Sequence, residues 1–458
     1  MPSQHEWRTF ARWGDLYGGL ASATILGQTL VIVNDPKIAV DLLDKRSSAF
    51  SDRPVMQMGG ELVGWRNTLV LLPYGDRFRR FRRLFHHSIG TRASVKHFHP
   101  AEEIETRRFL RRVLAQPDAL AAHIRKTAGA IILRISHGYE VREHGDPLVA
   151  LADDATEQFS HATSPGGFLV NTIPALRHLP EWFPGAGFHA TAREWAATLA
   201  QMVETPHNFV KQQMAKGIAP VSFTSRLLQQ EKQLTAEDEF DIKWAAASLY
   251  SGGADTTVSS IYALFLALAT NPAAARKAQA EIDGVTGGAR LPTFADRAAL
   301  PYVDALAAEV FRWHTVVVPA VPHRAMEDAV YGGYRIPKGA LVMPNIWKFT
   351  HDPRTYADPF AFEPDRYFGP RAEPDPRQTV AFGFGRRVCP GSNLADASVF
   401  IAAAMALAVF DVSPAAGDGA PPVLEETAGT ISHPKPYRCT IRPRSERAVA
   451  LIQGDGAA

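Results

Sequence analysis

The sequence predicts a mostly α-helical fold: one large helical domain over residues 1–458, with small β-sheets near the N-terminus and in the C-terminal half. Helix formers at amphipathic spacing fill the middle of the chain. Strand-like alternation is confined to the first sixty residues and to short segments after residue 315, and no repeat or low-complexity tract divides the chain. Hydrophobic residues make up 46% and charged residues 21%, as in globular proteins with a large core.

The first predicted elements are two strands in "ASATILGQTLVIVN" (residues 21–34), separated by a turn at Gly27 and Gln28. Three amphipathic helices are predicted next, from helix formers at helical spacing. They are "FRRFRRLFHHSI" (residues 78–89), "AEEIETRRFLRRVLA" (residues 101–115) and "ATAREWAATLAQMVETPHNFVKQQMA" (residues 190–215).

The longest predicted helix begins at Thr235 and ends roughly 35 residues later at Asn271-Pro272. Thr235 followed by Asp238 is an N-cap signal, and the proline stops the helix. This length far exceeds the average of about 12 residues. Because the segment is apolar on most faces, we expect it to cross the centre of the molecule. The segments 164–188 and 353–376 are rich in proline and glycine but contain aromatic residues throughout, which predicts ordered loops.

Charge, cysteine content and hydropathy exclude several classes of protein. A net charge near +2 gives no drive toward nucleic acid. Two cysteines are too few for a disulfide framework, which favours a reducing compartment. The first residues lack the apolar core of a signal peptide, and the run from Ser398 to Phe410 is shorter than the about 20 residues that a spanning helix needs. We therefore expect no membrane-spanning segment.

One of the two cysteines, Cys389, lies in the unusual loop "FGFGRRVCPG". Glycines allow tight turns that bring N–H groups toward the sulfur, and the predicted helix after Gly391 directs its positive end at a thiolate. A single cysteine does not fit a tetrahedral zinc site, but one thiolate suits an iron whose other positions are filled by a macrocycle. Taken alone, the pattern leaves a buried structural cysteine, or a disulfide with Cys439, as alternatives.

The loop resembles the haem-binding signature of the cytochrome P450 family, in the pattern Phe382-x-x-Gly385-x-Arg387-x-Cys389-x-Gly391. The resemblance implies haem b as the cofactor and Cys389 as the thiolate ligand of its iron. It also implies that Arg387 contacts a haem propionate and that Phe382 belongs to the haem-binding loop. Cys439 matches no part of the family pattern and is expected to be structural.

A second family motif is the pair Glu309 and Arg312 in "ALAAEVFRWH", on one face of a predicted helix. Such pairs alone are mostly surface ion pairs worth under about 1 kcal/mol. The resemblance implies a third member, Arg366 in "FEPDRYF", and a buried network that holds the cysteine loop against the helices. Its role would be structural.

The long helix contains "SGGADTTVSS", which resembles the oxygen-groove motif of the family. A threonine hydroxyl in a helix can bond back to the carbonyl four residues earlier, here from Thr256 to Gly252, and bend the helix. Two glycines would leave room above the haem, and Gly253 is the one we expect to border the cofactor. By resemblance, Thr256 hydrogen-bonds dioxygen and Asp255 feeds protons inward. The alternative is a capping-type Asp-Thr pair at a helix break.

The resemblance also predicts cations for the haem propionates. Phe78-x-x-x-Arg82 stands where the family commonly has Trp-x-x-x-Arg, so an indole N–H donor is lost. His323 in "VPHRAMED" and Arg53 in "FSDRP" are the other expected partners. The remaining arginines of this run are predicted to form a solvated face, or else a docking patch for a negatively charged electron donor: Arg77, Arg79, Arg80 and Arg83.

Residues 59–78 and 322–353 resemble fungal secondary-metabolism members of the family, such as O-methylsterigmatocystin oxidoreductase. This resemblance implies a monooxygenase that inserts one atom of dioxygen into a hydrophobic small molecule, with electrons from NADPH-cytochrome P450 reductase. We expect the apolar segments 56–72, 167–173 and 316–321 to line the substrate pocket.

Fungal members normally begin with a membrane anchor and a proline-rich hinge, and neither is seen in this sequence. We expect the endoplasmic reticulum membrane surface if the parent chain carries an anchor, and the cytosolic face of that membrane for the chain as given. The apolar loop from Leu179 to Phe188 is a candidate for peripheral membrane contact, and the protein is expected to be a monomer. Two alternatives stay open: a peroxide-using or rearranging enzyme of the same fold that needs no reductase, and a helical binding protein with a buried structural cysteine.

Overall fold

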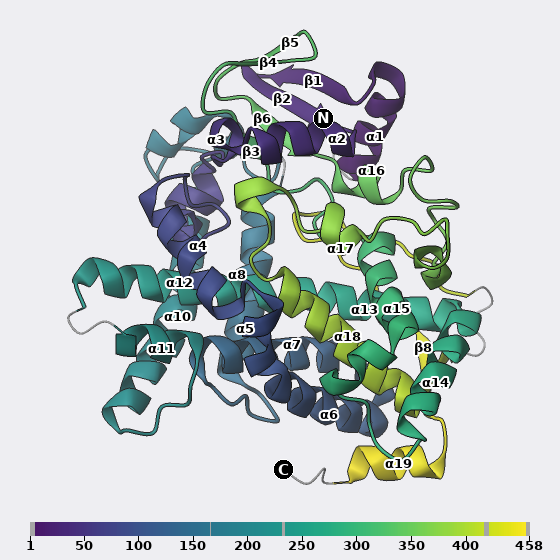
Figure 1. Cartoon of the computed structure of the whole chain (residues 1–458). Helices are drawn as coiled ribbons and strands as arrows, with labels where there is room; N and C mark the ends of the chain where they lie inside the picture. Colours follow the sequence, from purple (N-terminus) through teal and green to yellow (C-terminus); the bar gives the residue numbers. More distant parts are fainter. Residues whose placement is uncertain (1–4, 165, 231–233, 416–420, 455–458) are drawn as a thin grey trace.

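The computed structural model describes residues 5–164, 166–230, 234–415 and 421–454. Helices make up most of it, with the strands gathered mainly at one end of the molecule (Figure 1). The longer helices are α1 (Glu6–Tyr17), α4 (Asp76–Ile89), α6 (His99–Ala115), α7 (Leu120–His137), α8 (Pro147–Thr163), α10 (Phe188–Ala215), α11 (Phe223–Gln230), α12 (Ala236–Ala254), α13 (Thr256–Thr270), α14 (Pro272–Thr286), α15 (Pro301–Trp313), α18 (Ser392–Val409) and α19 (Glu446–Gln453). The short ones are α2 (Pro36–Ala39), α3 (Ser47–Phe50), α5 (Arg92–Val95), α9 (Leu169–Thr172), α16 (Ile346–Thr350) and α17 (Pro376–Thr379).

The mostly helical class is confirmed, and the three amphipathic segments form α4, α6 and α10. The two regions expected to be ordered loops carry short helices: α9 and the turn Pro174–His178 in the first, and the turn Pro364–Tyr367 in the second. One aromatic side chain in each segment contacts a helix: the ring of Phe168 lies 5.7 Å from that of Trp195 in α10, and the ring of Phe368 lies 6.1 Å from that of Tyr302 in α15.

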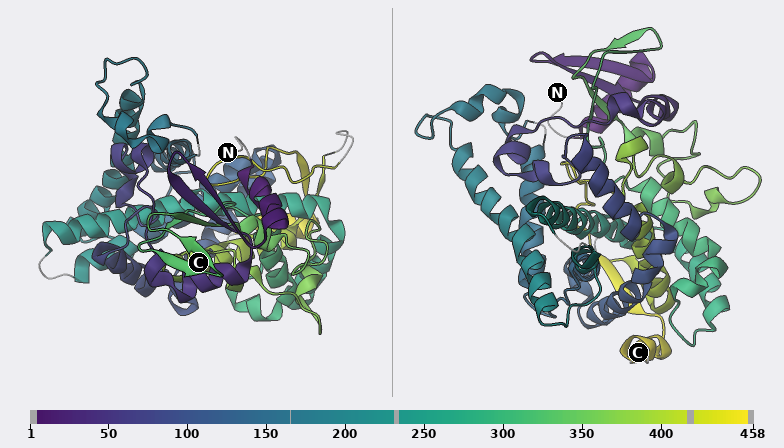
Figure 2. Two further views of the ribbon diagram at one scale, coloured as in Figure 1. Left: turned by 90° about the horizontal axis from the view of Figure 1, so that it is seen from above. Right: turned by 60° about the vertical axis from the view of Figure 1, so that its left-hand side comes forward.

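The strands form one mixed sheet and two small hairpin-like pairs. They are β1 (Leu20–Ile25), β2 (Gln28–Val33), β3 (His323–Arg324), β4 (Ala329–Tyr331), β5 (Tyr334–Ile336), β6 (Leu341–Pro344), β7 (Phe410–Pro414) and β8 (Cys439–Pro443). The mixed sheet has the order β1-β2-β6-β3, with β2 parallel to β6. Small sheets are therefore present near the N-terminus and in the C-terminal half, as predicted, but β3 and β6 join the N-terminal strands in one sheet, and β7-β8 lies apart from it at the opposite end of the molecule (Figure 2).

The long central helix is divided in two at Asp255, which separates α12 from α13. The predicted capping box at its start is present, because Thr235 and Asp238 exchange side-chain and backbone hydrogen bonds. The predicted end is also correct, since α13 stops at Thr270 and α14 starts at Pro272. Asp255 has φ −118° and ψ −37° and interrupts the regular helix at the glycine-rich motif.

Helix α18 follows the cysteine loop and crosses the centre of the molecule beside α13 and α15 (Figure 1). Among the described helices it alone is long and apolar enough to span a membrane by itself, but 78% of it is buried within the protein. A second candidate arises only if α12 and α13 are joined with α14 across a bend of 104°. Burial of α18 against its neighbours is the property of a core helix.

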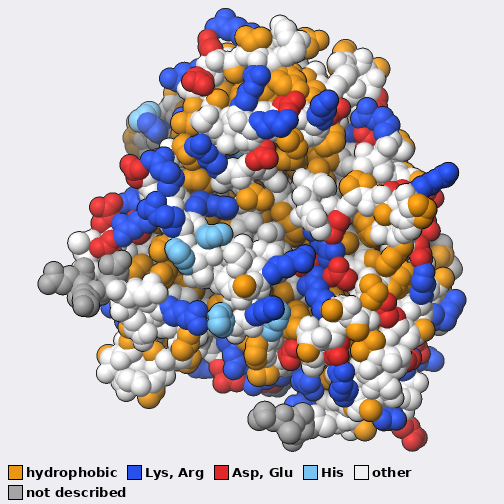
Figure 3. Space-filling view, viewed as in Figure 1, with side chains coloured by type: hydrophobic (Ala, Val, Ile, Leu, Met, Phe, Trp, Pro, Cys, Tyr) orange, Lys and Arg blue, Asp and Glu red, His pale blue; other side chains and the backbone are white. Residues whose placement is uncertain are grey.

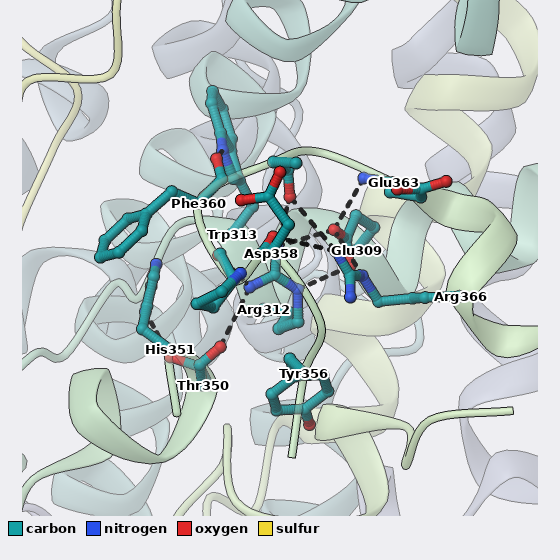
Figure 4. A network of polar contacts seen from close by, with 12 residues as sticks. Glu309, Arg312, Trp313, Thr350, His351, Tyr356, Asp358, Phe360, Glu363 and Arg366 are labelled. Carbon is teal, nitrogen blue, oxygen red and sulfur yellow. Dashed lines mark hydrogen bonds and ion pairs between the residues drawn. The ribbon is translucent and has the colours of Figure 1, made fainter. Parts of the chain in front are cut away.

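A closed network of buried charges joins α15 to the loop that follows α16 (Figure 4). Arg312 donates from Nε and Nη2 to the two carboxylate oxygens of Glu309 at 2.8 and 2.7 Å, and Arg366 Nε donates to Glu309 Oε1 at 3.1 Å. The Tyr367 hydroxyl also donates to Glu309, and Arg366 donates from Nη1 to the carboxylate of Glu373. Every charge has an opposite partner, which is the condition for burying ions. The predicted Glu309–Arg312–Arg366 network is thus present.

Two arginines of α4 do not form the solvated face expected from the sequence. Arg77 Nε lies 2.8 Å from Asp241 Oδ1, and Arg80 ion-pairs with Asp238 and Asp241. Both acceptors lie on α12, so these arginines fasten α4 to the central helix. The expectation is wrong for Arg77 and Arg80, because their partners become neighbours only in the folded chain.

We expect Arg366→Lys to lower the free energy of unfolding by about 3 kcal/mol, because lysine cannot replace the planar group that pairs with Glu309 and Glu373 in the interior. Arg354→Lys is the matched control, since the Arg354 side chain is 68% exposed and pairs with Asp352. It should cost less than about 1 kcal/mol. Thermal and denaturant unfolding measure both changes, and equal losses would contradict a stabilising role for the buried network.

Candidate active site

Two glycines determine the shape of the loop that carries Cys389. Gly383 and Gly385 have φ of +78° and +54°, in the left-handed region that favours glycine. A Cβ on Gly385 would also lie 2.0 Å from the carbonyl oxygen of Leu43, so no side chain fits there. The loop closes with a hydrogen bond from the Cys389 N–H to the carbonyl of Phe382, 2.8 Å long. The sequence therefore places Cys389 by backbone constraints.

The Cys389 thiol is free, as is that of Cys439 in β8, so the disulfide alternative is not realised. Burial raises the pKa of Cys389, while the N–H of Gly391 and the charge of Arg82 act to lower this pKa. The Cys389 side chain is exposed, so other side chains of the protein do not cover the thiol. Helix α18 begins at Ser392, two residues after Pro390, and directs its N-terminus toward this region.

Near this thiol lies a group of three guanidinium ions and one imidazole, which we call the arginine cluster: Arg53, Arg82, Arg387 and His323. Their charges act on one another, which places them close together. Within the described residues none of the four forms an ion pair with a carboxylate. Their acceptors are backbone carbonyls: Arg53 donates to Val70, Val321 and Pro322, Arg82 to Val388, Arg387 to Ser51, Leu69 and Leu72, and His323 Nδ1 contacts Phe50.

The arginine cluster is electrostatically incomplete. Burial and the charge of Arg387 hold the pKa of Arg53 well below its usual value. Burial lowers the pKa of Arg387 to about 10; nearby Asp52 opposes this shift and Arg82 adds to it. Burial and the charge of Arg53 also lower the pKa of His323. Since arginine stays charged, the cluster needs an anion, and the two carboxylates of a haem meet that need. The residues present therefore fit a haem.

Phe78 occupies the position where the sequence predicted the loss of an indole donor. The Arg387 guanidinium lies 3.8 Å from the centroid of the Phe78 ring. An aromatic face attracts a cation without donating a hydrogen bond. The structure thus replaces a polar contact to the cofactor with a stacking contact that orients Arg387.

On the other side of the site, the break between α12 and α13 has the predicted hydrogen bond. The Thr256 hydroxyl donates to the carbonyl of Gly252 at 2.7 Å. Gly252 has open space where a Cβ would lie, whereas a Cβ on Gly253 would be 2.7 Å from Cδ1 of Ile132 in α7. This placement favours Gly252 over the predicted Gly253 as the glycine that borders the cofactor. Gly253 instead allows α12 to pack closely on α7.

Asp255 lies beside Thr256 and is bound by two basic side chains. Its Oδ2 lies 3.0 Å from Nε2 of His433, and its Oδ1 lies 3.3 Å from Nη1 of Arg125. Burial raises the pKa of Asp255, but the hydrogen bond and charge of His433 and the charge of Arg125 outweigh burial, so the pKa is lowered. The carboxylate is therefore held ionised. Neither basic partner was identified from the sequence, because each comes from a distant segment.

A helical fold that combines a free cysteine thiol beside Arg82, an arginine cluster that needs an anion and a central helix interrupted at Asp255 fits a haem-thiolate oxidoreductase. Comparison with known proteins makes the assignment specific. The family model "Cytochrome P450" matches residues 3–441. The chain belongs to the cytochrome P450 family.

Fungal cytochrome P450 enzymes are similar in sequence to this protein over nearly its whole length. Cytochrome P450 monooxygenase 208 of Postia placenta is 54% identical and covers 99% of this chain and 89% of its own length. Cytochrome P450 monooxygenase claR of Ampulloclitocybe clavipes is 48% identical, and the match covers 99% of this chain and 85% of the relative. O-methylsterigmatocystin oxidoreductase of Aspergillus flavus is 39% identical, and the match covers 98% of this chain and 85% of the relative. Monooxygenase chemistry with dioxygen, a small-molecule substrate and a redox partner is that of the family, which decides against a helical binding protein.

Solved structures agree in fold. A zebra fish cytochrome P450 determined with progesterone superposes with a TM-score of 0.81 at 23% identity, covering 97% of this chain and 100% of its own. The resemblance to fungal members stated from the sequence is confirmed by the relatives, and family members bind haem through a cysteine thiolate.

We expect Arg387→Ala to speed haem loss by roughly 10- to 100-fold, because a charge-assisted hydrogen bond is worth about 1.5–3 kcal/mol. Arg386→Ala is the control, since the neighbouring Arg386 is exposed and contacts Tyr74. Transfer of haem to a scavenging protein measures the rate, and circular dichroism checks the fold of both variants. Equal rates for the two would show that the arginine cluster does not hold the cofactor.

Proposed function

We propose that residues 1–458 form one haem-thiolate monooxygenase domain that oxidises a hydrophobic small molecule in fungal secondary metabolism. Cys389 would be the iron ligand, and the observation that carries this proposal is its free thiol in a glycine-shaped loop beside the arginine cluster. The fungal relatives, one of them named O-methylsterigmatocystin oxidoreductase, support the metabolic setting.

The cofactor would be held by groups on both sides of the cysteine loop. Arg82, Arg387, Arg53 and His323 would bind its two carboxylates, and Phe382, whose ring lies 5.2 Å from that of Phe311, would pack against its edge. When bound, haem supplies the chemistry that transfers one atom of dioxygen to the substrate while the other atom leaves as water. The protein's contribution is to hold, orient and supply protons.

Proton supply is the proposed role of Thr256 and Asp255. The Thr256 hydroxyl donates a hydrogen bond to the Gly252 carbonyl, so its oxygen can accept a hydrogen bond from a water above the cofactor. Asp255 lies one residue before it and is ionised, so it can take a proton from a donor and pass it on. The pair would therefore deliver protons in a region that excludes bulk water.

The substrate is proposed to enter between the segments 56–72, 167–173 and 316–321, which are mainly apolar. The first two are linked by a hydrogen bond from the Met58 N–H to Asn171 Oδ1, 2.9 Å long. In the third segment, the Val316 carbonyl accepts a hydrogen bond from the Ser432 N–H. Apolar segments joined mainly through backbone groups favour a hydrophobic ligand.

Electrons are proposed to come from NADPH-cytochrome P450 reductase. Basic side chains spread over the face that carries α4, α5 and α18 (Figure 3). The exposed cations near the cysteine loop are Arg83, Arg92, Lys96 and Arg386. Such a surface attracts a negatively charged donor and speeds its association.

We place the enzyme at the endoplasmic reticulum membrane surface, acting as a monomer. In the loop between α9 and α10, Trp182 is 81% and Phe183 45% exposed. Large exposed aromatic side chains next to one another are suited to the interface of a lipid bilayer. This loop would give peripheral contact.

The ligand assignment predicts a specific spectrum. Reduced protein treated with carbon monoxide should show a Soret band at the thiolate position, and Cys389→Ser should lose it because the iron no longer has a sulfur ligand. Cys439→Ser is the matched control and should keep the band, because Cys439 lies in β8. Loss of the band in Cys439→Ser and not in Cys389→Ser would overturn the assignment.

The role of Thr256 predicts uncoupling. With NADPH and reductase, Thr256→Ala should form roughly five- to tenfold less product per NADPH, with more hydrogen peroxide, for the loss of a hydrogen bond worth about 1–1.5 kcal/mol. Thr257→Ala, at the adjacent buried position, should stay near wild type. Turnover of the wild type with peroxide alone, and none with NADPH and reductase, would favour the peroxide-using alternative.

A further inference from the structure

The ionised Asp255 has two basic partners, and only one of them can exchange a proton near neutral pH. Arg125 keeps its proton because a guanidinium does not ionise in proteins. An imidazole changes its charge between about pH 5 and 8. His433 is therefore the partner that can give Asp255 a proton, across a contact of 3.0 Å between Nε2 and Oδ2.

His433 connects Asp255 with solvent. The side chain of His433 is 22% exposed, while that of Asp255 is 13% exposed. The other charged group that faces this pair is Asp153 of α8, which shares Arg125 with Asp255. On the far side of the strand-like segment that carries His433 lie Glu426 and His314, 3.4 Å apart. No other residue contacting Asp255 combines exposure with an exchangeable proton among those that the structure describes.

The backbone holds His433 in place from both sides of the preceding residue. The Ser432 N–H donates to the carbonyl of Val316, and its carbonyl accepts from the hydroxyl of Ser259 at 2.6 Å. Because Ser259 has one proton and gives it to Ser432, Nε2 of His314 must donate to Ser259, at 2.7 Å. Ser259 lies one turn after Asp255 on α13, so the helix that carries the acid also fixes the segment that carries the imidazole.

We propose that His433 is a positioning residue that reloads Asp255 with protons during turnover. The imidazolium Nε2–H passes its proton to Oδ2 of Asp255, the neutral imidazole regains a proton from water at its exposed edge, and no electrons are transferred. This inference rests on the proposed role of Asp255 and extends it by naming the group that connects the acid to solvent. Arg125 fixes the carboxylate and contributes no proton.

The test compares His433→Gln with Arg125→Gln. Glutamine can still donate a hydrogen bond to Asp255 but cannot carry a proton. A positioned general acid raises the rate of a reaction about 10²- to 10⁴-fold. Because water can partly replace His433 as the proton donor to Asp255, we expect the product formed per NADPH at pH 7 to fall on the order of tenfold in His433→Gln. Product formed per NADPH should depend on pH in the wild type, because an imidazole can take up and release a proton, and His433→Gln should show a flat profile. Arg125→Gln should keep the wild-type slope.

A second measurement is independent of turnover. In protein labelled with ¹⁵N-histidine and examined in the diamagnetic ferrous carbon monoxide form, one ring N–H signal should be lost in both His433→Gln and Asp255→Ala and kept in Arg125→Gln, because alanine removes the acceptor of the hydrogen bond. A signal that survives Asp255→Ala would overturn the contact.

The two proposals fail in different ways. If Asp255→Asn couples as well as wild type, the role of Asp255 itself is refuted. If Asp255→Asn uncouples while His433→Gln keeps wild-type coupling and its pH slope, the acid is correct and His433 is only a structural contact.

Discussion

The organisation of this protein depends on the requirement that buried charge be compensated. Three groups of charged side chains meet this requirement in different ways. Glu309, Arg312 and Arg366 are complete by themselves, so that region is closed and structural. The arginine cluster has hydrogen bonds only to carbonyl oxygens, so it is complete only with an added dianion. Asp255 has two basic partners, and one of them is an imidazole. The degree of compensation thus separates a scaffold, a cofactor site and a proton path.

The fold brings these constellations together through backbone features that few residues specify. Gly385 allows the cysteine loop to touch the carbonyl of Leu43, which no other residue could do without displacing it. The break at Asp255 opens the central helix where Gly252 leaves free space. Helix α18 then leads the chain from the cysteine loop into the core. Because each feature is a local exception to regular structure, the site lies where the regular helices stop.

Much of this could be predicted because its signals are local. The capping box at Thr235 and the stop at Pro272 bounded the central helix correctly, and the cysteine loop was recognisable from ten residues. The rest depends on contacts between distant segments. Pairing of Leu30 with Leu341 places β6 of the C-terminal half in the same sheet as the N-terminal strands. Arg77 and Arg80 found carboxylates on α12. The choice between Gly252 and Gly253 depended on Ile132 of α7, which no pattern within the motif reveals.

His433 shows why the most informative residue for proton movement was also the least visible in the sequence. It lies in the C-terminal segment and has no motif of its own, and its backbone is held by Thr427 while that of Ser432 is held by Ser259 and Val316. Those holding contacts use backbone groups of Ser432, which constrain the position of the chain and leave the identity of the next side chain free. The residues proposed to hold the cofactor are conspicuous in the sequence, whereas the contact between His433 and Asp255 depends on the fold.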